Sequence, residues 1–146
     1  MIRRTFVQLM LAGALVAEGS SAAIAKSVAK AAAKPGVVIQ VSDDDPKNWN
    51  QALNVIKNIQ SEYGKNKVNV ELVVFGRGAG LLKFDSPLAN RIDDTLASGA
   101  AVSMCQNTMT GQKLTEADMH PKIGYVKAGV IEIITKSKKG WAVVRP

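Results

Sequence analysis

A nearly continuous apolar run at residues 68–75 is the feature that most constrains the fold of this chain. A strand with one solvated face alternates apolar and polar side chains, so an unbroken run favours a strand covered on both faces, as in a parallel sheet. Residues 37–41 form a shorter β-branched run that also suits a buried strand. The main apolar positions of the longer run are Val70, Leu72, Val73, Val74 and Phe75.

The segment between these two runs has the pattern of a helix. Asp45 can cap its start and Pro46 takes the first helical position. Apolar residues then recur at helical spacing on one face, and Gly64 closes the segment. The residues of that face are Trp49, Ala52, Leu53, Ile56, Ile59 and Tyr63.

A second helix is predicted to begin at Ser86-Pro87, with a stripe that includes Ile92 and Leu96, and to end at Gly99. The next strand covers residues 100–104 and reaches Cys105. A polar loop and a short turn around residues 115–119 follow.

The remaining residues of the chain are expected to hold two strands and a helix. The strands are predicted at residues 125–126 and 141–144. Residues 130–138 have the composition of a strand, but their length and their position between two strands favour a crossover helix. The alternation of strands and helices predicts an α/β fold, an open and mostly parallel sheet with helices on both faces.

The first 25 residues have the pattern of an export signal. Arg3-Arg4 supply the charged start, residues 6–17 form the apolar run, and residues 23–25 are a small-x-small cleavage site. The run of about 12 residues is short of the roughly 20 that span a bilayer, although an uncleaved anchor is the alternative. Arg3-Arg4 also resemble a twin-arginine signal. We therefore expect a periplasmic protein without a stable membrane span after processing, in which residues 26–36 are a linker and residues 37–146 the domain.

Composition excludes several classes of function. One cysteine rules out an intramolecular disulfide, and one histidine leaves too few ligands for most histidine-based metal centres. Lysine and arginine total 19 against 12 acidic residues, a net charge of +7. The lysines between Lys113 and Lys139 lack interleaved aromatic residues, so they predict a solvated or weakly anion-attracting face rather than a nucleic-acid site. We expect no metal, no cofactor and no nucleic-acid partner.

Three further motifs have more than one interpretation. Residues 76–81 are rich in glycine, but Leu81 stands where the dinucleotide fingerprint needs a glycine, so a structural turn, a pocket wall and a phosphate loop are all considered. The three aspartates at residues 43–45 are interpreted as a capped, solvated loop rather than a metal cluster. His120 is predicted to be a surface residue rather than a base.

Cys105 is the strongest candidate for chemistry. It directly follows a predicted buried strand, at the sheet edge where α/β proteins place their sites. The residues after it can present backbone N–H groups and hydroxyls, which stabilise a thiolate. The position is equally compatible with a buried, inert cysteine.

Several segments of the domain together resemble the DsrE/DsrF-like sulfur-carrier superfamily, particularly its small single-domain branch. The most specific are Cys-x-Asn-Thr at residues 105–108 and the closing Gly-Trp…Arg-Pro at residues 140–146. The resemblance covers residues 37–146. The other matching pieces are residues 38–42, Trp49, Ala52, Leu53, Asn54, Asn58, residues 73–78 and residues 128–130.

The resemblance implies a five-stranded DsrE-like fold and a homo-oligomer, a trimer or a hexamer. In relatives of this family, a cysteine after the third strand accepts sulfane sulfur as a persulfide, and Cys105 matches that position. Those relatives are cytoplasmic, whereas this chain is predicted to be exported. The residues expected to shape the pocket or support the thiolate are Asn58, Gly76, Arg77, Gly78, Asn107 and Thr108.

Two functional hypotheses follow. The first is an exported sulfur-handling protein in which Cys105 carries a persulfide between a sulfur donor and an acceptor, each a protein or a small sulfur compound. The second is a non-catalytic oligomeric module that binds a small ligand or a partner protein in the same sheet-edge pocket. The sequence contains no independent catalytic constellation, so it leaves open whether the protein is an enzyme.

Overall fold

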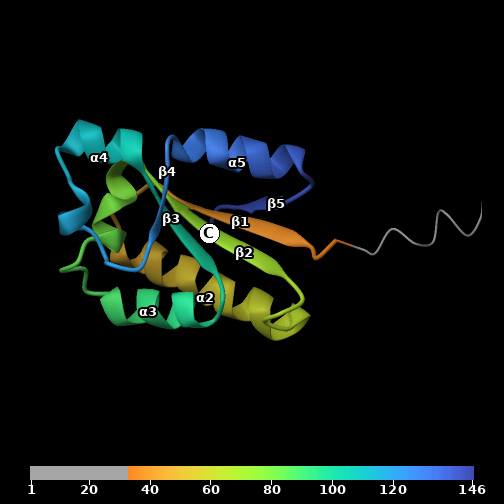
Figure 1. The fold of residues 1–146 in the computed structure, drawn as a ribbon. Coiled ribbons are helices and arrows are strands. Elements are labelled where there is room, and N and C mark those ends of the chain that lie inside the picture. Colours follow the sequence, from red (N-terminus) through yellow and green to blue (C-terminus); the bar gives the residue numbers. More distant parts are fainter. Residues whose placement is uncertain (1–32) are drawn as a thin grey trace, which may run out of the picture. The chain divides into compact units, whose positions relative to one another are not determined.

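The computed structural model describes residues 33–146 (Figure 1). The predicted export signal and residues 26–32 of the predicted linker lie outside this range. Gly36 already belongs to the first strand, and Pro35 accepts a hydrogen bond from Asn69 N–H at 2.9 Å. Within residues 33–146, no helix combines the length and hydrophobicity needed to cross a bilayer.

Five strands form one open sheet in the order β4-β3-β2-β1-β5, and every pairing between neighbours is parallel. The predicted α/β fold and its five-stranded sheet are thereby confirmed. The strands are β1 (Gly36–Val41), β2 (Asn69–Val74), β3 (Ala101–Cys105), β4 (Gly124–Val126) and β5 (Ala142–Val144).

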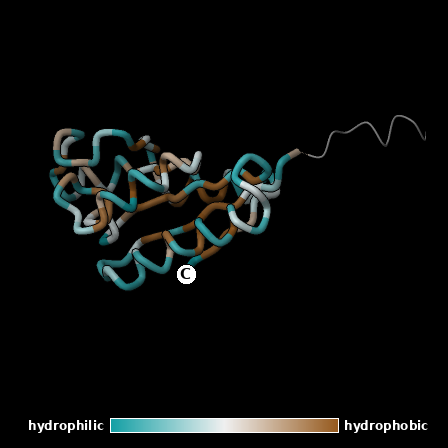
Figure 2. Tube along the Cα trace, turned by 90° about the horizontal axis from the view of Figure 1, so that it is seen from below, coloured by the Kyte–Doolittle hydropathy of each residue, from teal (hydrophilic) through white to brown (hydrophobic). Residues whose placement is uncertain are grey.

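Helices cover both faces of the sheet. Helices α2 (Pro46–Tyr63) and α3 (Ala89–Ala97) lie on one face, while α4 (Gln106–Gln112) and α5 (Gly129–Lys138) lie on the other (Figure 1). The hydrophobic stretches run through the strands, whereas the helices alternate between hydrophilic and hydrophobic residues (Figure 2). The main core therefore forms between the sheet and the apolar stripes of the helices.

Helix α2 begins and ends as its sequence predicts. The Asp45 carboxylate accepts a hydrogen bond from Lys47 N–H at 2.9 Å, and Gly64 ends the helix with a φ of 91°. The buried face differs in its last turn. Tyr63 is 54% exposed, whereas Gln60 is buried and donates from its side chain to Ser98 O at 3.1 Å.

Two secondary-structure predictions were wrong. Helix α3 begins at Ala89, because Ser86 and Pro87 belong to a preceding turn in which Ser86 O accepts from Ala89 N–H at 3.1 Å. The predicted polar loop after Cys105 is helix α4. Its single buried side chain, Met109, packs into the main core, so tertiary burial stabilises a helix that the polar composition conceals.

His120 is buried, with 4% of its surface exposed, so its prediction as a surface residue was also wrong. Met119, the residue before His120, forms an antiparallel bridge with Lys83, and His120 N–H donates to Leu82 O at 2.8 Å. The imidazole Nε2 lies 3.5 Å from the Asp93 carboxylate. His120 therefore has a structural role, because it contacts both Leu82 and Asp93 of helix α3.

Candidate functional site

Cys105 is the last residue of β3, at the edge of the sheet where the parallel strands end. It pairs with Val126 of β4 and immediately precedes α4. Only 5% of its surface is exposed. The chain contains no other cysteine, so any chemistry of a thiol in this protein belongs to this residue.

Hydrogen-bond donors from two helices lie around the Cys105 sulfur. Burial raises the pKa of the thiol, but the Thr108 hydroxyl and the backbone N–H of Gly129 lower it. The backbone N–H groups of Thr108 and Asn107 lower it further. The net pKa lies below the ordinary cysteine value, so these donors outweigh the cost of burying the thiolate.

The donors act without a tight capping bond. Cys105 occupies the position before the first turn of α4, yet its sulfur makes no capping hydrogen bond of standard geometry. Asn107 N–H also donates to Lys127 O at 3.2 Å, so it is shared between two acceptors. Thr108 and Gly129 are therefore the principal sources of thiolate stabilisation.

Thr108 is held in place by the glycine-rich segment. Gly76 N–H donates to Thr108 Oγ1 at 2.8 Å, so the hydroxyl accepts from one side and keeps its own proton to donate to the sulfur. The Gln112 side-chain amide donates back to Gly76 O at 2.8 Å. The backbone of Gly76 has a φ of 58°, a left-handed conformation that favours glycine.

The glycine-rich segment is a 3₁₀ helix, η1 (Gly76–Leu82). Gly78 N–H donates to Phe75 O at 3.2 Å. With Gly76 N–H engaged by Thr108, neither group is directed at a phosphate. A Cβ on Gly78 would lie 2.9 Å from Val41 O, so this glycine permits a close approach of two backbones. The segment is a structural turn that supports the site.

The structure separates the other expected site residues. Arg77 is exposed on η1, and its charge is not among the groups that lower the thiol pKa. Asn58 is exposed on α2. It lies twelve residues after Pro46, about 18 Å along the helix at 1.5 Å per residue. Because α2 runs back along the sheet from the edge where the strands end, Asn58 lies away from Cys105.

Gly129 is a site residue whose role sequence reasoning did not identify. Its N–H is the first of α5, and a Cβ there would lie 3.0 Å from the Phe75 ring and 3.1 Å from Phe75 Cβ. The absence of a side chain therefore lets α5 begin close to the end of β2 and near Cys105. The glycine before a predicted crossover helix was the available signal, but its distance from Cys105 in sequence conceals the contact.

No metal site is present in the part of the chain that the structure describes, where no three potential ligands among His, Cys, Asp and Glu converge. The aspartates at residues 43–45 have structural roles instead. Asp45 caps α2, and the carbonyl of Asp43 accepts from the Trp49 indole N–H at 2.8 Å. The Asp43 carboxylate also lies 3.5 Å from the Arg145 guanidinium.

Three solved structures share the fold of this chain. MTH1491 from Methanobacterium thermoautotrophicum, a protein of unknown function, is 23% identical with a TM-score of 0.73, over 77% of this chain and 99% of its own. BT1422 from Bacteroides thetaiotaomicron, a conserved protein of unknown function, is 16% identical with a TM-score of 0.63, over 76% and 94%. The ychN protein from E. coli is 10% identical with a TM-score of 0.63, over 78% and 100%.

No family model and no curated protein matches the sequence. At the identities given above, the three structures establish the fold alone. The likeness covers nearly the full length of each of the three proteins, so they have the same domain plan as residues 34–146.

Proposed function

We propose that the protein carries sulfane sulfur as a persulfide on Cys105. The observation that carries this proposal is the group of donors that lowers the pKa of a thiol at the carboxyl edge of a parallel sheet. The resemblance of the Cys-x-Asn-Thr segment to DsrE-like sulfur carriers supports it. The fold that the chain shares with the three solved structures is compatible with it.

The proposed chemistry has two balanced steps. The Cys105 thiolate attacks the outer sulfur of a sulfane donor such as thiosulfate; the new S–S bond forms as the old one breaks, and sulfite leaves. An acceptor thiolate then attacks the terminal sulfur of the persulfide, takes that sulfur, and returns Cys105 as a thiolate. Neither step requires a metal or an organic cofactor. Thr108 and Gly129 stabilise the negative charge on Cys105 at the start and the end of the cycle.

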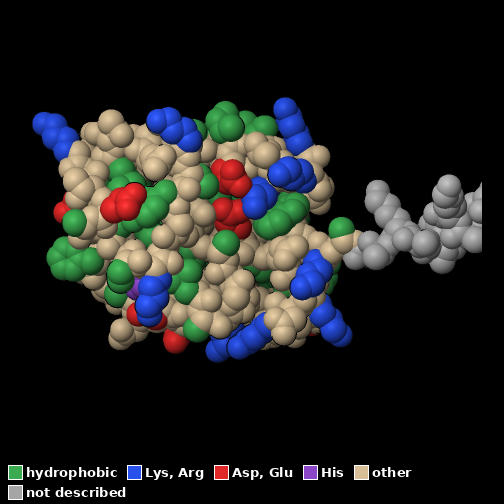
Figure 3. Space-filling view, viewed as in Figure 1, with side chains coloured by type: hydrophobic (Ala, Val, Ile, Leu, Met, Phe, Trp, Pro, Cys, Tyr) green, Lys and Arg blue, Asp and Glu red, His purple; other side chains and the backbone are tan. Residues whose placement is uncertain are grey.

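The partner and the compartment belong to the same proposal. The predicted export signal favours a periplasmic protein. The family resemblance implies a trimer or a hexamer, and apolar side chains exposed on α5 and β5 support self-association. These apolar residues are Val130, Ile131, Ile134 and Val143. Hydrophobic and basic side chains are interspersed on the face of the molecule that Figure 3 shows. Light scattering of the full chain should give a mass of several protomers, and a stable monomer at micromolar concentration would contradict self-association.

Intact mass spectrometry tests the sulfur-carrier proposal. After treatment with polysulfide or thiosulfate, the protein should gain the mass of one sulfur atom, and a reductant should remove it. Cys105→Ser should gain none. Because the chain has one cysteine, the site of addition needs no further assignment.

The alternative is a binding module without sulfur transfer. The observation that favours it is the 5% exposure of Cys105, which restricts the approach of a large acceptor. A thiol that gains sulfur only after denaturation would reject the carrier proposal and leave the binding module.

A further inference from the structure

We infer that the groove between α2 and α3 is a binding site for a small organic dianion, a molecule with two carboxylate or phosphate groups joined by a short uncharged body. The groove has a volume of about 500 Å³, within the range of sites for small molecules. It lies on the side of the sheet that α2 and α3 cover, and it contains none of the residues around Cys105. The inference is therefore independent of the sulfur-carrier proposal.

The groove forms because two helical stripes face each other across it. On α2, Leu53, Ile56 and Gln60 follow at intervals of three and four, so they share one side of the helix. On the opposite side, Thr95 of α3 and Ser98, which directly follows α3, are small, so the helices leave space between them. Leu53 and Ile56 are buried and give the groove an apolar base.

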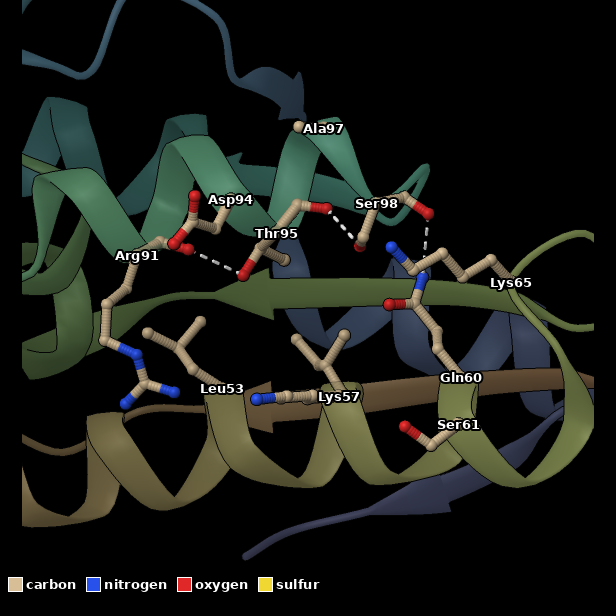
Figure 4. A pocket seen from close by; sticks show the side chains of 11 residues that line it. Leu53, Lys57, Gln60, Ser61, Lys65, Arg91, Asp94, Thr95, Ala97 and Ser98 are labelled. Carbon is tan, nitrogen blue, oxygen red and sulfur yellow. Dashed lines mark hydrogen bonds between the residues drawn. The ribbon is translucent and has the colours of Figure 1, made fainter.

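The charged side chains that line the groove are three cations and one carboxylate. Arg91 stands at one end of the groove with Asp94 of α3 on the same side, Lys65 stands at the other end, and Lys57 lies between them (Figure 4). Among the ion pairs of residues 33–146, none joins any of these three cations to an acidic side chain. The lining thus has two positive charges more than negative ones, and a cation stands at each end of the groove.

Arg91 is fixed in position without being neutralised. Its guanidinium donates to the side chain of Asn50, to Asn50 O at 3.4 Å and to Asn54 Oδ1 at 2.7 Å. All three acceptors are uncharged, so the arginine is held against α2 while its full charge remains. A positioned, uncompensated guanidinium is suited to a carboxylate or a phosphate group.

Gln60 provides an ordered polar group in the middle of the groove. It is 5% exposed, and its Nε2 donates to Ser98 O at 3.1 Å, which fixes the orientation of the amide. Its Oε1 is turned toward the space between the helices (Figure 4). That oxygen can accept a hydrogen bond from a hydroxyl or amide in the body of the ligand.

Binding of defined probes by the full chain tests this inference. Glutarate and 3-phosphoglycerate represent the dicarboxylate and the mixed carboxylate and phosphate forms of the ligand, and glutaramide is the uncharged match for glutarate. Titrations followed by the amide NMR shifts of the protein should show changes at groove residues with the anions, and little change with glutaramide. The affinity should fall as ionic strength rises.

Matched lysine variants complete the test. Lys57→Gln and Lys65→Gln should each weaken binding by about threefold, and the double variant by about tenfold. Lys47→Gln removes an exposed lysine of α2 outside the groove and should leave binding unchanged. Cys105→Ser should also bind normally.

Three results would overturn the inference. One is equal binding of glutaramide and glutarate. Another is an affinity in the double variant that equals that of the wild type. The third is no binding of either anion at millimolar concentration.

Discussion

The two faces of the sheet are held together by different means. On the α2 and α3 side, one large cluster of buried apolar residues joins the strands to the helices. On the α5 side, the buried cluster contains only Val38, Val73 and Ile133, and a buried carboxylate, Glu71, stands beside it. Residues of β2 alternate between these faces, so the same strand supplies the apolar core and the charged group.

The charged group on the α5 side belongs to a network. Glu71 Oε1 accepts from the Ser103 hydroxyl at 2.8 Å, and Lys136 Nζ lies 2.8 Å from Oε2. The latter contact is an ion pair rather than an aligned hydrogen bond, because Oε2 has no partner with hydrogen-bond geometry. Lys136 also stands 3.5 Å from the Glu132 carboxylate and 4.3 Å from the centroid of the Trp141 ring.

The two faces of the sheet differ in what they contribute: one mainly stabilises the fold, and the other positions α5 next to the site. The apolar face supplies most of the buried hydrophobic area that stabilises the fold. The α5 face uses a few directional contacts, which fix where α5 lies, and α5 begins with the Gly129 N–H that acts on Cys105. Changes on the first face should lower stability, and changes on the second should also alter the thiol.

The largest effect is expected from truncating a core isoleucine on the apolar face. Ile56 of α2 is 1% exposed, so Ile56→Ala should lower the free energy of unfolding by about 4 kcal/mol. Ile133 of α5 is 8% exposed in a smaller cluster, so the same substitution there should cost about 2 kcal/mol. Denaturant unfolding of both variants measures the difference, and equal losses would contradict the contrast between the faces.

Removing the lysine from the buried ion pair should have the next largest effect. Lys136→Met leaves the Glu71 carboxylate buried without its cation, which should cost about 3 kcal/mol. Lys138→Met, an exposed lysine on the same helix, is the matched control and should cost little. Adding Glu71→Gln to Lys136→Met should recover part of the loss. A double variant no more stable than Lys136→Met would contradict the ion-pair account.

The same pair makes a prediction about pH. Burial lowers the pKa of Lys136, but its contacts with Glu71 and Glu132 raise it more, so the folded pKa is above the ordinary lysine value. The contribution of the pair to stability is therefore complete below that ordinary value and is lost as pH rises through the folded pKa. Unfolding at increasingly alkaline pH should show the wild type losing its advantage over Lys136→Met. A constant difference at all pH values would contradict this assignment.

A smaller change in the thiol is expected from Gly129→Ala. The new Cβ would lie 3.0 Å from the Phe75 ring and 3.1 Å from Phe75 Cβ, which is tighter than ordinary packing. We expect the start of α5 to move away from Phe75, and its N–H to move relative to the Cys105 sulfur. The pKa of the thiol should rise, measured from the pH dependence of alkylation. Gly111→Ala, where a Cβ meets nothing within 4 Å, is the matched control. An unchanged thiol pKa in Gly129→Ala would show that Gly129 does not act on Cys105.

Sequence patterns predicted the elements of the fold better than the contacts of the site. Local residue order is enough to predict the buried strands, the start of α2 at Asp45-Pro46 and the position of Cys105 at the end of a strand. Glu71 could not be recognised as the buried half of an ion pair, because Lys136 is distant in sequence. The burial of His120 likewise depends on a bridge between distant loops.

The site residues divide in the same way. Thr108 and Asn107 were expected near Cys105 because they follow it in the next turn. Asn58 was expected from a family resemblance, and the direction of α2 carries it away from the edge where β3 ends. Gly76 acts through a hydrogen bond to Thr108, which only the folded arrangement reveals.

The rate of Cys105 alkylation as a function of pH, in the native protein, tests the central claim most directly. The account predicts a thiolate titration below the ordinary cysteine value of about 8.5. In Thr108→Val the titration should move upward, because the hydroxyl that stabilises the thiolate is lost while the shape is nearly kept. A wild-type titration at or above the ordinary value, or a thiol that reacts only after unfolding, would contradict the claim that this site activates Cys105.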